Sequence, residues 1–131
     1  MPPVDWLAVV AATAASFAIG ALWYSPLLFA KAWQRESGVT DEQARGGMAV
    51  IFGGAFVLMF LAAAVFAMFL GPEPGLAFGA GAGFAAGLFW VAASFGVSYL
   101  FERRSFNLWL INGGYNVAAF TAIGSVIGAL S

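Results

Sequence analysis

Four long apolar segments constrain this chain more than any other feature of its sequence. They cover residues 4–30, 46–70, 75–101 and 106–130, and no charged side chain lies away from their ends. Each is longer than the ~20 residues that cross a ~30 Å hydrocarbon core. Because backbone groups in lipid must be satisfied within their own segment, each segment is predicted to be a helix. The sequence therefore predicts an all-α fold, a transmembrane four-helix bundle that forms a single domain over residues 1–131.

The scarcity of charge excludes several other classes of protein. Only 8% of the residues are charged, against about 25% in soluble domains, so the outer surface must face lipid. A net charge of −1 gives no basic surface for nucleic acid. The chain has no cysteine and no histidine, which removes thiolate chemistry and the commonest general base and metal ligand. We therefore expect no catalytic residues, no metal site, no cofactor and no nucleic-acid partner.

The basic residues lie in only two of the connections between the segments. They are Lys31, Arg35 and Arg45 in the connection of residues 31–45, and Arg103 and Arg104 in the short last connection. The N-terminus, the turn at residues 71–74 and the C-terminus carry none. By the positive-inside rule, both basic connections are predicted to be cytoplasmic and both termini to lie outside. The predicted localisation is thus the cell membrane, crossed four times.

The sequence also predicts how individual helices begin. The first segment has no basic residues before its apolar run and carries Asp5. It is therefore predicted to be a retained helix that begins at Pro2 and Pro3, not a secretory signal. Thr40 is followed three residues later by Gln43, a spacing that predicts a capping box at the cytoplasmic start of the second helix.

Glycine recurs at every fourth position of the third segment, at Gly75, Gly79, Gly83 and Gly87. Glycine costs about 1 kcal/mol relative to alanine inside a helix, and in a membrane its benefit is the close approach of two backbones. This glycine zipper is predicted either to pack within one chain or to join two copies in a homodimer or higher oligomer. The second segment is bulkier and is expected to expose the most surface to lipid. Small residues of the other two segments are predicted to pack as well: Ala8, Ala12, Ser16, Gly20, Gly114 and Ala118.

Polar side chains of three segments fall at similar depths on the cytoplasmic side. At 1.5 Å per residue, Tyr24 lies roughly 10 Å into the membrane, Asn112 about 10 Å and Asn116 about 16 Å. Amides that face lipid would cost a few kcal/mol, so these side chains are predicted to point inward. Pro26 removes a helix hydrogen bond and is predicted to kink the first helix. The predicted polar cluster comprises Tyr24, Ser25, Ser94, Ser98, Tyr99, Glu102, Arg103, Arg104, Asn107, Asn112, Tyr115 and Asn116.

The cluster has two interpretations, which the sequence leaves open. In the first, its hydrogen bonds hold the helices together, each contributing around 0.6 to 2 kcal/mol. In the second, it is a polar pocket open to the cytoplasm, with Glu102, Arg103 and Arg104 at its mouth. The sequence does not specify a small-molecule ligand for such a pocket.

The two most distinctive stretches of the chain are GALWYSPLLFAKAW, residues 20–33, and YLFERRSFNLWLINGGYNV, residues 99–117. Together they resemble a family of small bacterial membrane proteins, domain of unknown function 1761, and the resemblance extends over essentially the whole chain. It implies a four-helix integral membrane protein of the bacterial inner membrane, and it implies no activity. The positions that match the family's motifs are Trp23, Tyr24, Ser25, Pro26, Phe29, Trp33, Glu102, Asn112, Gly113 and Tyr115.

Three classes of function remain open. The expected one is a structural, lipid-binding or partner-binding bundle, with membrane lipids as partners. The alternative is a small oligomeric transporter or channel for a polar solute, although no acidic residue lies deep in the first segment, as small multidrug exporters require. The third is a membrane enzyme of glutathione-transferase-like type, in which Tyr99, Arg103 and Arg104 would bind an anion. We expect the protein not to be an enzyme.

Overall fold

The computed structural model describes residues 4–131 and, within them, all side chains except those of Ala44 and Arg45. The predicted start of the first helix at Pro2 and Pro3 lies outside the described residues. All regular structure in the described part is helical. The helices are α1 Trp6–Trp23, α2 Ala30–Ser37, α3 Asp41–Arg45, α4 Met48–Leu70, α5 Leu76–Ala85, η1 Ala86–Ala92, α6 Ala93–Glu102 and α7 Phe106–Leu130.

Four of these helical stretches are long and apolar enough to cross a membrane, which confirms the all-α prediction and the predicted number of spans. They are α1, α4, α7 and the continuous helix that α5, η1 and α6 form over Leu76–Glu102. The middle part of that helix, η1, is a π-helix. Since η1 continues the α-helices on both sides, the span changes its winding without a break.

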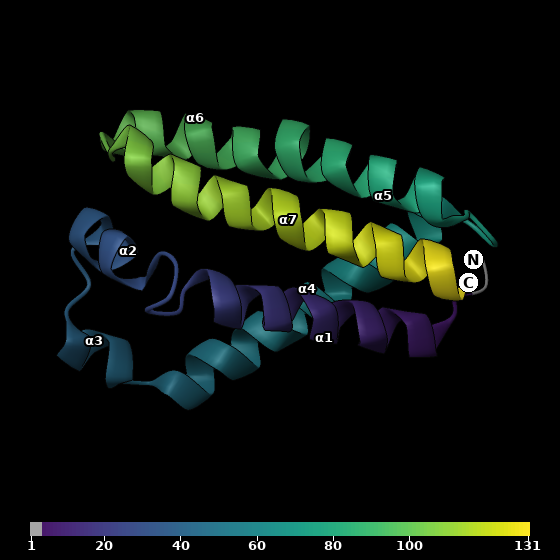
Figure 1. Ribbon diagram of the computed structural model, residues 1–131, viewed down its shortest axis with the longest axis horizontal. Helices are drawn as coiled ribbons and strands as arrows, with labels where there is room; N and C mark the ends of the chain where they lie inside the picture. Colours follow the sequence, from purple (N-terminus) through teal and green to yellow (C-terminus); the bar gives the residue numbers. More distant parts are fainter. Residues whose placement is uncertain (1–3) are drawn as a thin grey trace.

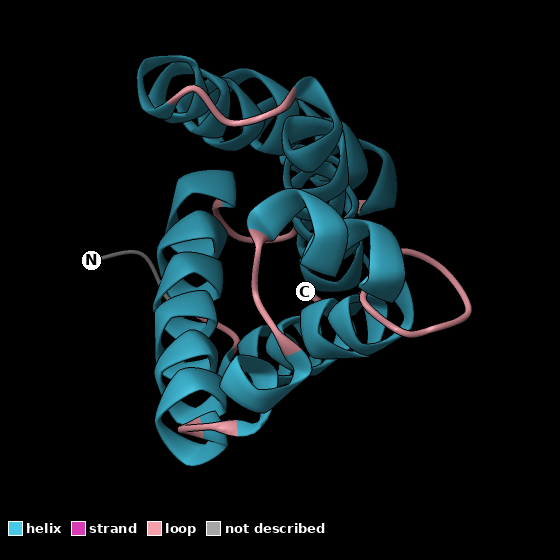
Figure 2. Cartoon of the chain, turned by 90° about the vertical axis from the view of Figure 1, so that its left-hand side faces the viewer, coloured by secondary structure: helices cyan, strands magenta, loops and turns pink. Residues whose placement is uncertain are grey.

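The bundle is organised around α7. Figure 1 shows α7 running alongside the α5–η1–α6 helix, with α1 on its other side. α4 packs mainly on α1 and diverges from the bundle toward α3. Val4 and Ser131 line one hollow at one end of the molecule, whereas α2, α3 and the α6–α7 turn lie at the other end, which faces the viewer in Figure 2.

The first helix does not continue to residue 30, so the predicted kink at Pro26 is wrong. α1 ends at Trp23, and α2 begins only at Ala30. Pro26 has no N–H to donate and disfavours a helical residue before it. The carbonyl of Leu22 accepts instead from Ser25, from its backbone N–H at 3.2 Å and from its hydroxyl at 2.7 Å. The freed backbone groups are therefore satisfied by turns, and the chain leaves the helix.

The connection of residues 31–45 contains helical structure, α2 and α3, where the sequence predicted a hydrophilic connection. The capping box is confirmed, because the Thr40 hydroxyl accepts from the Gln43 N–H at 3.1 Å and the Gln43 side chain accepts from the Thr40 N–H at 3.0 Å. The helix that it begins is α3, however, and not the second membrane helix. Gly47 adopts a left-handed conformation with φ +66° and separates α3 from α4.

The glycines of the third span face α7 within the same chain. A Cβ added at Gly79 would overlap the carbonyl oxygen of Gly124, and one at Gly83 would overlap that of Phe120. At Gly87 an added Cβ would lie 2.9 Å from the Cα of Val117. Of the two predicted arrangements, the structure therefore has the packing within one chain, and α7 leaves no room at this face for a second copy.

The remaining glycine of the predicted zipper has a different place. Gly75 precedes α5 and caps it with a φ of +83°. An added Cβ at Gly128 in α7 would overlap the carbonyl oxygen of Gly75. Gly75 therefore contributes its backbone to the contact with α7 from outside the helix.

The π-helix continues the small-residue face beyond Gly87. Ala92 is buried at 1% exposure, and a Cβ added at Gly96 would lie 3.0 Å from the Trp109 indole nitrogen. The face therefore has intervals of four residues up to Gly87, five up to Ala92, and four up to Gly96. A π-turn closes with a bond between residues five apart, so the interval of five keeps the same face toward α7.

This register predicts that η1 tolerates a deletion. Removing Phe89, which is 67% exposed, should leave an ordinary α-turn in which Gly87 and Ala92 still face α7. Removing Leu110 from α7, at 49% exposure, should rotate one part of that helix by about 100° against the other. Thermal unfolding in detergent micelles should show a nearly unchanged midpoint for the first deletion and loss of the cooperative transition for the second. Equal effects of the two deletions would contradict the assigned register.

α4 is the most exposed of the four spans, as predicted for the second segment. Buried residues make up 17% of its apolar window, against 28–33% in the other spans. They all lie in its second half, from Ala63 to Leu70, where α4 packs on the bundle. Every residue from Met48 to Leu58 is exposed, and the contact of the Phe56 ring with Phe17 of α1 at 5.6 Å covers only part of this half.

Candidate functional site

The two distinctive stretches of the sequence meet where α1 ends against α7. The Trp23 indole nitrogen donates to the carbonyl of Ile111 at 2.9 Å. The Tyr24 hydroxyl donates to the side-chain oxygen of Asn112 at 2.7 Å. Gly114 makes room for this contact, since an added Cβ would lie 3.0 Å from the Trp23 ring. The end of α1 is thereby fixed to one turn of α7.

Asn112 joins three helices through one side chain. Its oxygen accepts from Tyr24, which follows α1, and its nitrogen donates to the hydroxyl of Tyr99 in α6 at 2.9 Å. All three side chains are half-buried. We call this chain of hydrogen bonds the Tyr24–Asn112–Tyr99 bridge. Both ends of the amide are therefore engaged by neighbouring helices.

Tyr115 forms a second link between α1 and α7. Its hydroxyl donates to the carbonyl of Ser16 at 3.2 Å, and its ring lies 5.5 Å from the ring of Tyr24. A Cβ added at Gly20 would lie 3.3 Å from the Tyr115 ring, so the glycine accommodates the aromatic side chain. The other predicted packing residues of α1, at Ala8, Ala12 and Ser16, are buried, and Ala118 is half-buried.

A second indole completes the contacts at this end of the bundle. The Trp109 indole nitrogen donates to the carbonyl of Ala92, the last residue of η1, at 2.8 Å. Sequence reasoning missed both Trp23 and Trp109 as members of the site. The available signal was chemical, because a buried indole N–H needs an acceptor. In so apolar a chain the nearest acceptors are backbone carbonyls.

Four other members of the predicted cluster do not join helices. Ser25 and Ser94 donate to carbonyls of their own segments, at 2.7 Å and 2.6 Å, and Asn116 donates to the carbonyl of Asn112 in its own helix at 2.9 Å. Ser98 is exposed. Short polar side chains readily bond to the backbone three or four residues earlier, so shared depth did not bring these groups together.

Of the charged residues 102–104, Arg104 contacts both Glu102, at 3.5 Å, and α2. Arg104 donates to the carbonyl of Ser37 at 3.4 Å, and next to it Ser105 donates to the carboxylate of Glu36 at 2.7 Å. A cation at the C-terminal end of α2 is favourable for the helix dipole. These two bonds connect the α6–α7 turn to the connection between the first two spans. Asn107, at the start of α7, is exposed and stands apart from the bridge.

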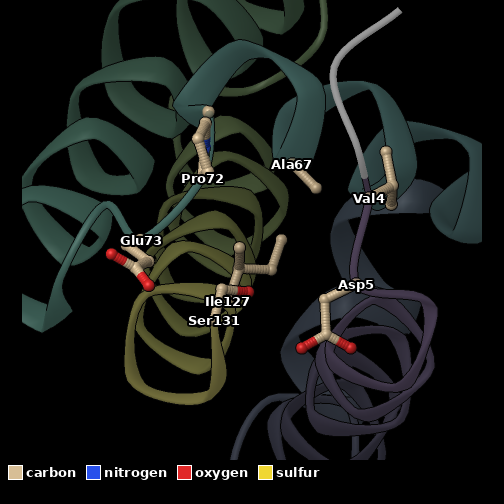
Figure 3. Close-up of a pocket in the computed structure, with 8 residues that line it drawn as sticks. Val4, Asp5, Ala67, Pro72, Glu73, Ile127 and Ser131 are labelled. Carbon is tan, nitrogen blue, oxygen red and sulfur yellow. The ribbon is translucent and has the colours of Figure 1, made fainter.

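Two hollows lie elsewhere in the molecule. One, of about 290 Å³, lies at the end that carries Val4 and Ser131. Figure 3 shows the carboxylates of Asp5 and Glu73 on either side of Ile127 and Ser131 in this hollow. The other is an apolar groove of about 220 Å³ between α4, η1 and α7. Neither hollow is lined by a residue of the predicted polar cluster.

The acidic side chains do not assemble a metal site in the described part of the chain. Among the side chains that the structure describes, no three His, Cys, Asp or Glu residues gather closely enough to hold a metal ion. Asp5 instead caps α1, where its carboxylate accepts from the N–H of Ala8 at 3.2 Å.

Comparison with known proteins identifies one family. The model of the family described as protein of unknown function, DUF1761, matches residues 7–128. The match includes both stretches that meet at the Tyr24–Asn112–Tyr99 bridge. No curated protein and no solved structure matches the chain.

Proposed function

The chain belongs to the family described as protein of unknown function, DUF1761, and we propose that it is an integral membrane bundle that acts by binding lipids or a protein partner. The family assigns no activity, so the proposal rests on the chemistry of this chain. In this proposal the Tyr24–Asn112–Tyr99 bridge holds the helices together, and the outer surfaces of the bundle carry the function.

The observation that carries this proposal is the engagement of Asn112. An asparagine side chain offers one carbonyl oxygen and one NH2 group. Here the first is bonded to Tyr24 and the second to Tyr99, on two other segments. A solute that entered this place would have to displace bonds between helices, each contributing around 0.6 to 2 kcal/mol. The bridge therefore favours a structural role over a ligand pocket.

The surfaces that remain free suit lipids. Large apolar side chains are exposed along the spans, above all on the first half of α4, as at Val50 and Leu58. Lys31, Arg35 and Arg103 are exposed at the end that carries α2 and the α6–α7 turn. Basic residues at that level attract anionic headgroups. By the positive-inside rule we assign this end to the cytoplasm and both termini to the outside.

The proposal predicts that Asn112→Leu weakens the bundle and that the wild-type protein has no transport activity. Two bonds are lost and two tyrosine hydroxyls are left without their partner, so the free energy of unfolding in bicelles should fall by about 1–3 kcal/mol. Asn107→Leu, at an exposed position of the same helix, should change it by less than about 0.5 kcal/mol. Wild-type proteoliposomes should pass sugars, amino acids and organic ions no faster than protein-free vesicles.

A different pair of results would favour a transporter. Solute flux through the wild-type protein that Asn112→Leu removes, with the free energy of unfolding unchanged and with flux retained in Asn107→Leu, would make the cluster a conduction pathway. The proposed structural role of the bridge would then be wrong.

A further inference from the structure

The apolar groove between α4, η1 and α7 has the properties of a binding site for part of a lipid. Its volume is about 220 Å³, below the ~300–1,000 Å³ of pockets that bury drug-sized ligands. The small side chains of Ala62 in α4 and Ala86 in η1 leave this volume unfilled, and phenylalanine and tryptophan side chains surround it. The groove therefore fits a narrow apolar chain and not a compact molecule.

Ring contacts between the helices hold the walls of the groove in place. Phe66 of α4 meets Phe120 of α7 edge to face, with ring centroids 6.2 Å apart. Phe69 of α4 meets Trp90 of η1 in the same way at 6.3 Å. Phe66 and Phe69 stack on each other at 6.0 Å. Such pairs have preferred geometries, so the walls form a fixed shape that a flexible ligand can fill.

The π-helix contributes the side of the groove opposite α4. Ala86 is buried there, while Trp90 and Val91, neighbours in the sequence, both line the groove. Trp90 is 64% exposed and Phe69 is 63% exposed, so the wall that these two rings form lies at the outer surface of the bundle. The groove is therefore accessible from the outer surface of the bundle, between the spans.

The position of the groove determines what can reach it. Ala86 and Trp90 lie ten and fourteen residues from Leu76, which places them about 15 and 21 Å along the span. On this span the groove lies within a ~30 Å hydrocarbon core, where the surrounding molecules are acyl chains. On α4 it reaches Phe69, next to the last residue of that helix, so the groove extends from the middle of the third span toward the end of α4. An empty groove would deprive its walls of dispersion contacts. An acyl chain inside the groove contacts the protein on several sides, whereas an acyl chain on the outer surface contacts the protein on one side only.

We propose that this groove is a specific binding site for an acyl chain of a membrane phospholipid. The inference rests on the proposed function as a lipid-binding membrane bundle, and it specifies where one acyl chain of a lipid binds. The bound chain fills the space over Ala62 and Ala86, between the rings of Phe66, Phe69 and Trp90. Its headgroup lies outside the groove, because only apolar and aromatic residues line the groove.

The test uses a phosphatidylglycerol that carries a photoreactive diazirine in the middle of one acyl chain. The full-length protein is reconstituted with it, irradiated and digested, and the modified peptides are identified by mass spectrometry. Native mass spectrometry of the detergent-purified protein reports whether a phospholipid is retained. We expect modification to concentrate on residues 62–69 and 86–91, and a phospholipid to remain bound after purification.

Substitutions separate the groove from the rest of the lipid-facing surface. Ala62→Phe fills the groove and should remove most of the modification at residues 62–69 and 86–91, together with the retained lipid. Val65→Phe, at a rim position that is 62% exposed, serves the same purpose with less risk to folding. Ala14→Leu on α1 is the matched control, because Ala14 is exposed and does not line the groove. It should leave both signals unchanged.

Three outcomes would overturn the inference, and they are distinguishable. Equal modification of the groove and of the exposed first half of α4 would mean ordinary contact with bulk lipid. A lipid-free dimer whose groove peptides stay unmodified would mean that a second copy covers the groove. Absence of mid-chain modification anywhere in the protein would refute the membrane placement itself, and so the proposed function as well.

Discussion

Gly83→Ala is expected to destabilise the bundle strongly, whereas Gly81→Ala, two residues away on the same helix, is expected to stabilise it. A Cβ at position 83 would overlap the backbone carbonyl oxygen of Phe120 in α7, and a backbone cannot yield as the end of a side chain can. Overpacking of this kind costs typically 1–3 kcal/mol. At Gly81 no atom lies within 4 Å of the added Cβ, so the variant gains the ~1 kcal/mol by which alanine exceeds glycine in a helix.

The two variants form a matched pair because the chemical change and the helix are the same. The gain in helix propensity is common to both variants, so reversible unfolding in bicelles, followed by circular dichroism, should place their free energies of unfolding about 1–3 kcal/mol apart. Equal stabilities of the two variants would mean that Gly83 does not face α7. The glycine face would then be open to lipid or to a second copy, which is the alternative that the sequence also allowed.

The spans could be predicted from the sequence because the requirement behind them is local. A segment that crosses lipid needs its own apolar side chains and its own backbone hydrogen bonds. The recurrence of glycine at Gly79, Gly83 and Gly87 likewise indicated a close helix contact. It did not identify α7 as the partner, since a small-residue face is compatible with any backbone that can approach it.

The break after α1 and the π-helix could not be predicted in the same way. Pro26 signals an interruption, but whether a helix bends or ends depends on where the freed groups find partners. Here the Phe29 N–H reaches the carbonyl of Trp23 at 3.0 Å and closes a turn. The interval of five between Gly87 and Ala92 becomes meaningful only when both residues are seen to contact α7.

The candidate site was anticipated in part. The depth argument placed Tyr24 and Asn112 at the same level, and the structure joins them through a hydrogen bond. The same argument also included Ser94 and Asn116, which bond to their own helices. Depth along a helix is readable from residue number, whereas the choice between a neighbouring helix and the local backbone depends on side-chain geometry.

The four crossings imply that the two ends of the bundle lie in different aqueous compartments. α3 and the turn between α4 and α5 are at opposite ends of α4 (Figure 1). With 23 residues, α4 alone spans about 35 Å, slightly more than the hydrocarbon core. A reagent that cannot cross a membrane should therefore distinguish the two ends completely, which is an all-or-none effect.

The most direct measurement is the labelling of single cysteines in intact cells, in a chain that has no cysteine of its own. Glu42→Cys in α3 and Glu73→Cys in the α4–α5 turn change exposed side chains. An impermeant maleimide should label Glu73→Cys in intact cells and label Glu42→Cys only after the membrane is opened. Labelling of both variants from the same side would contradict a bundle that crosses the bilayer four times with its basic end in the cytoplasm.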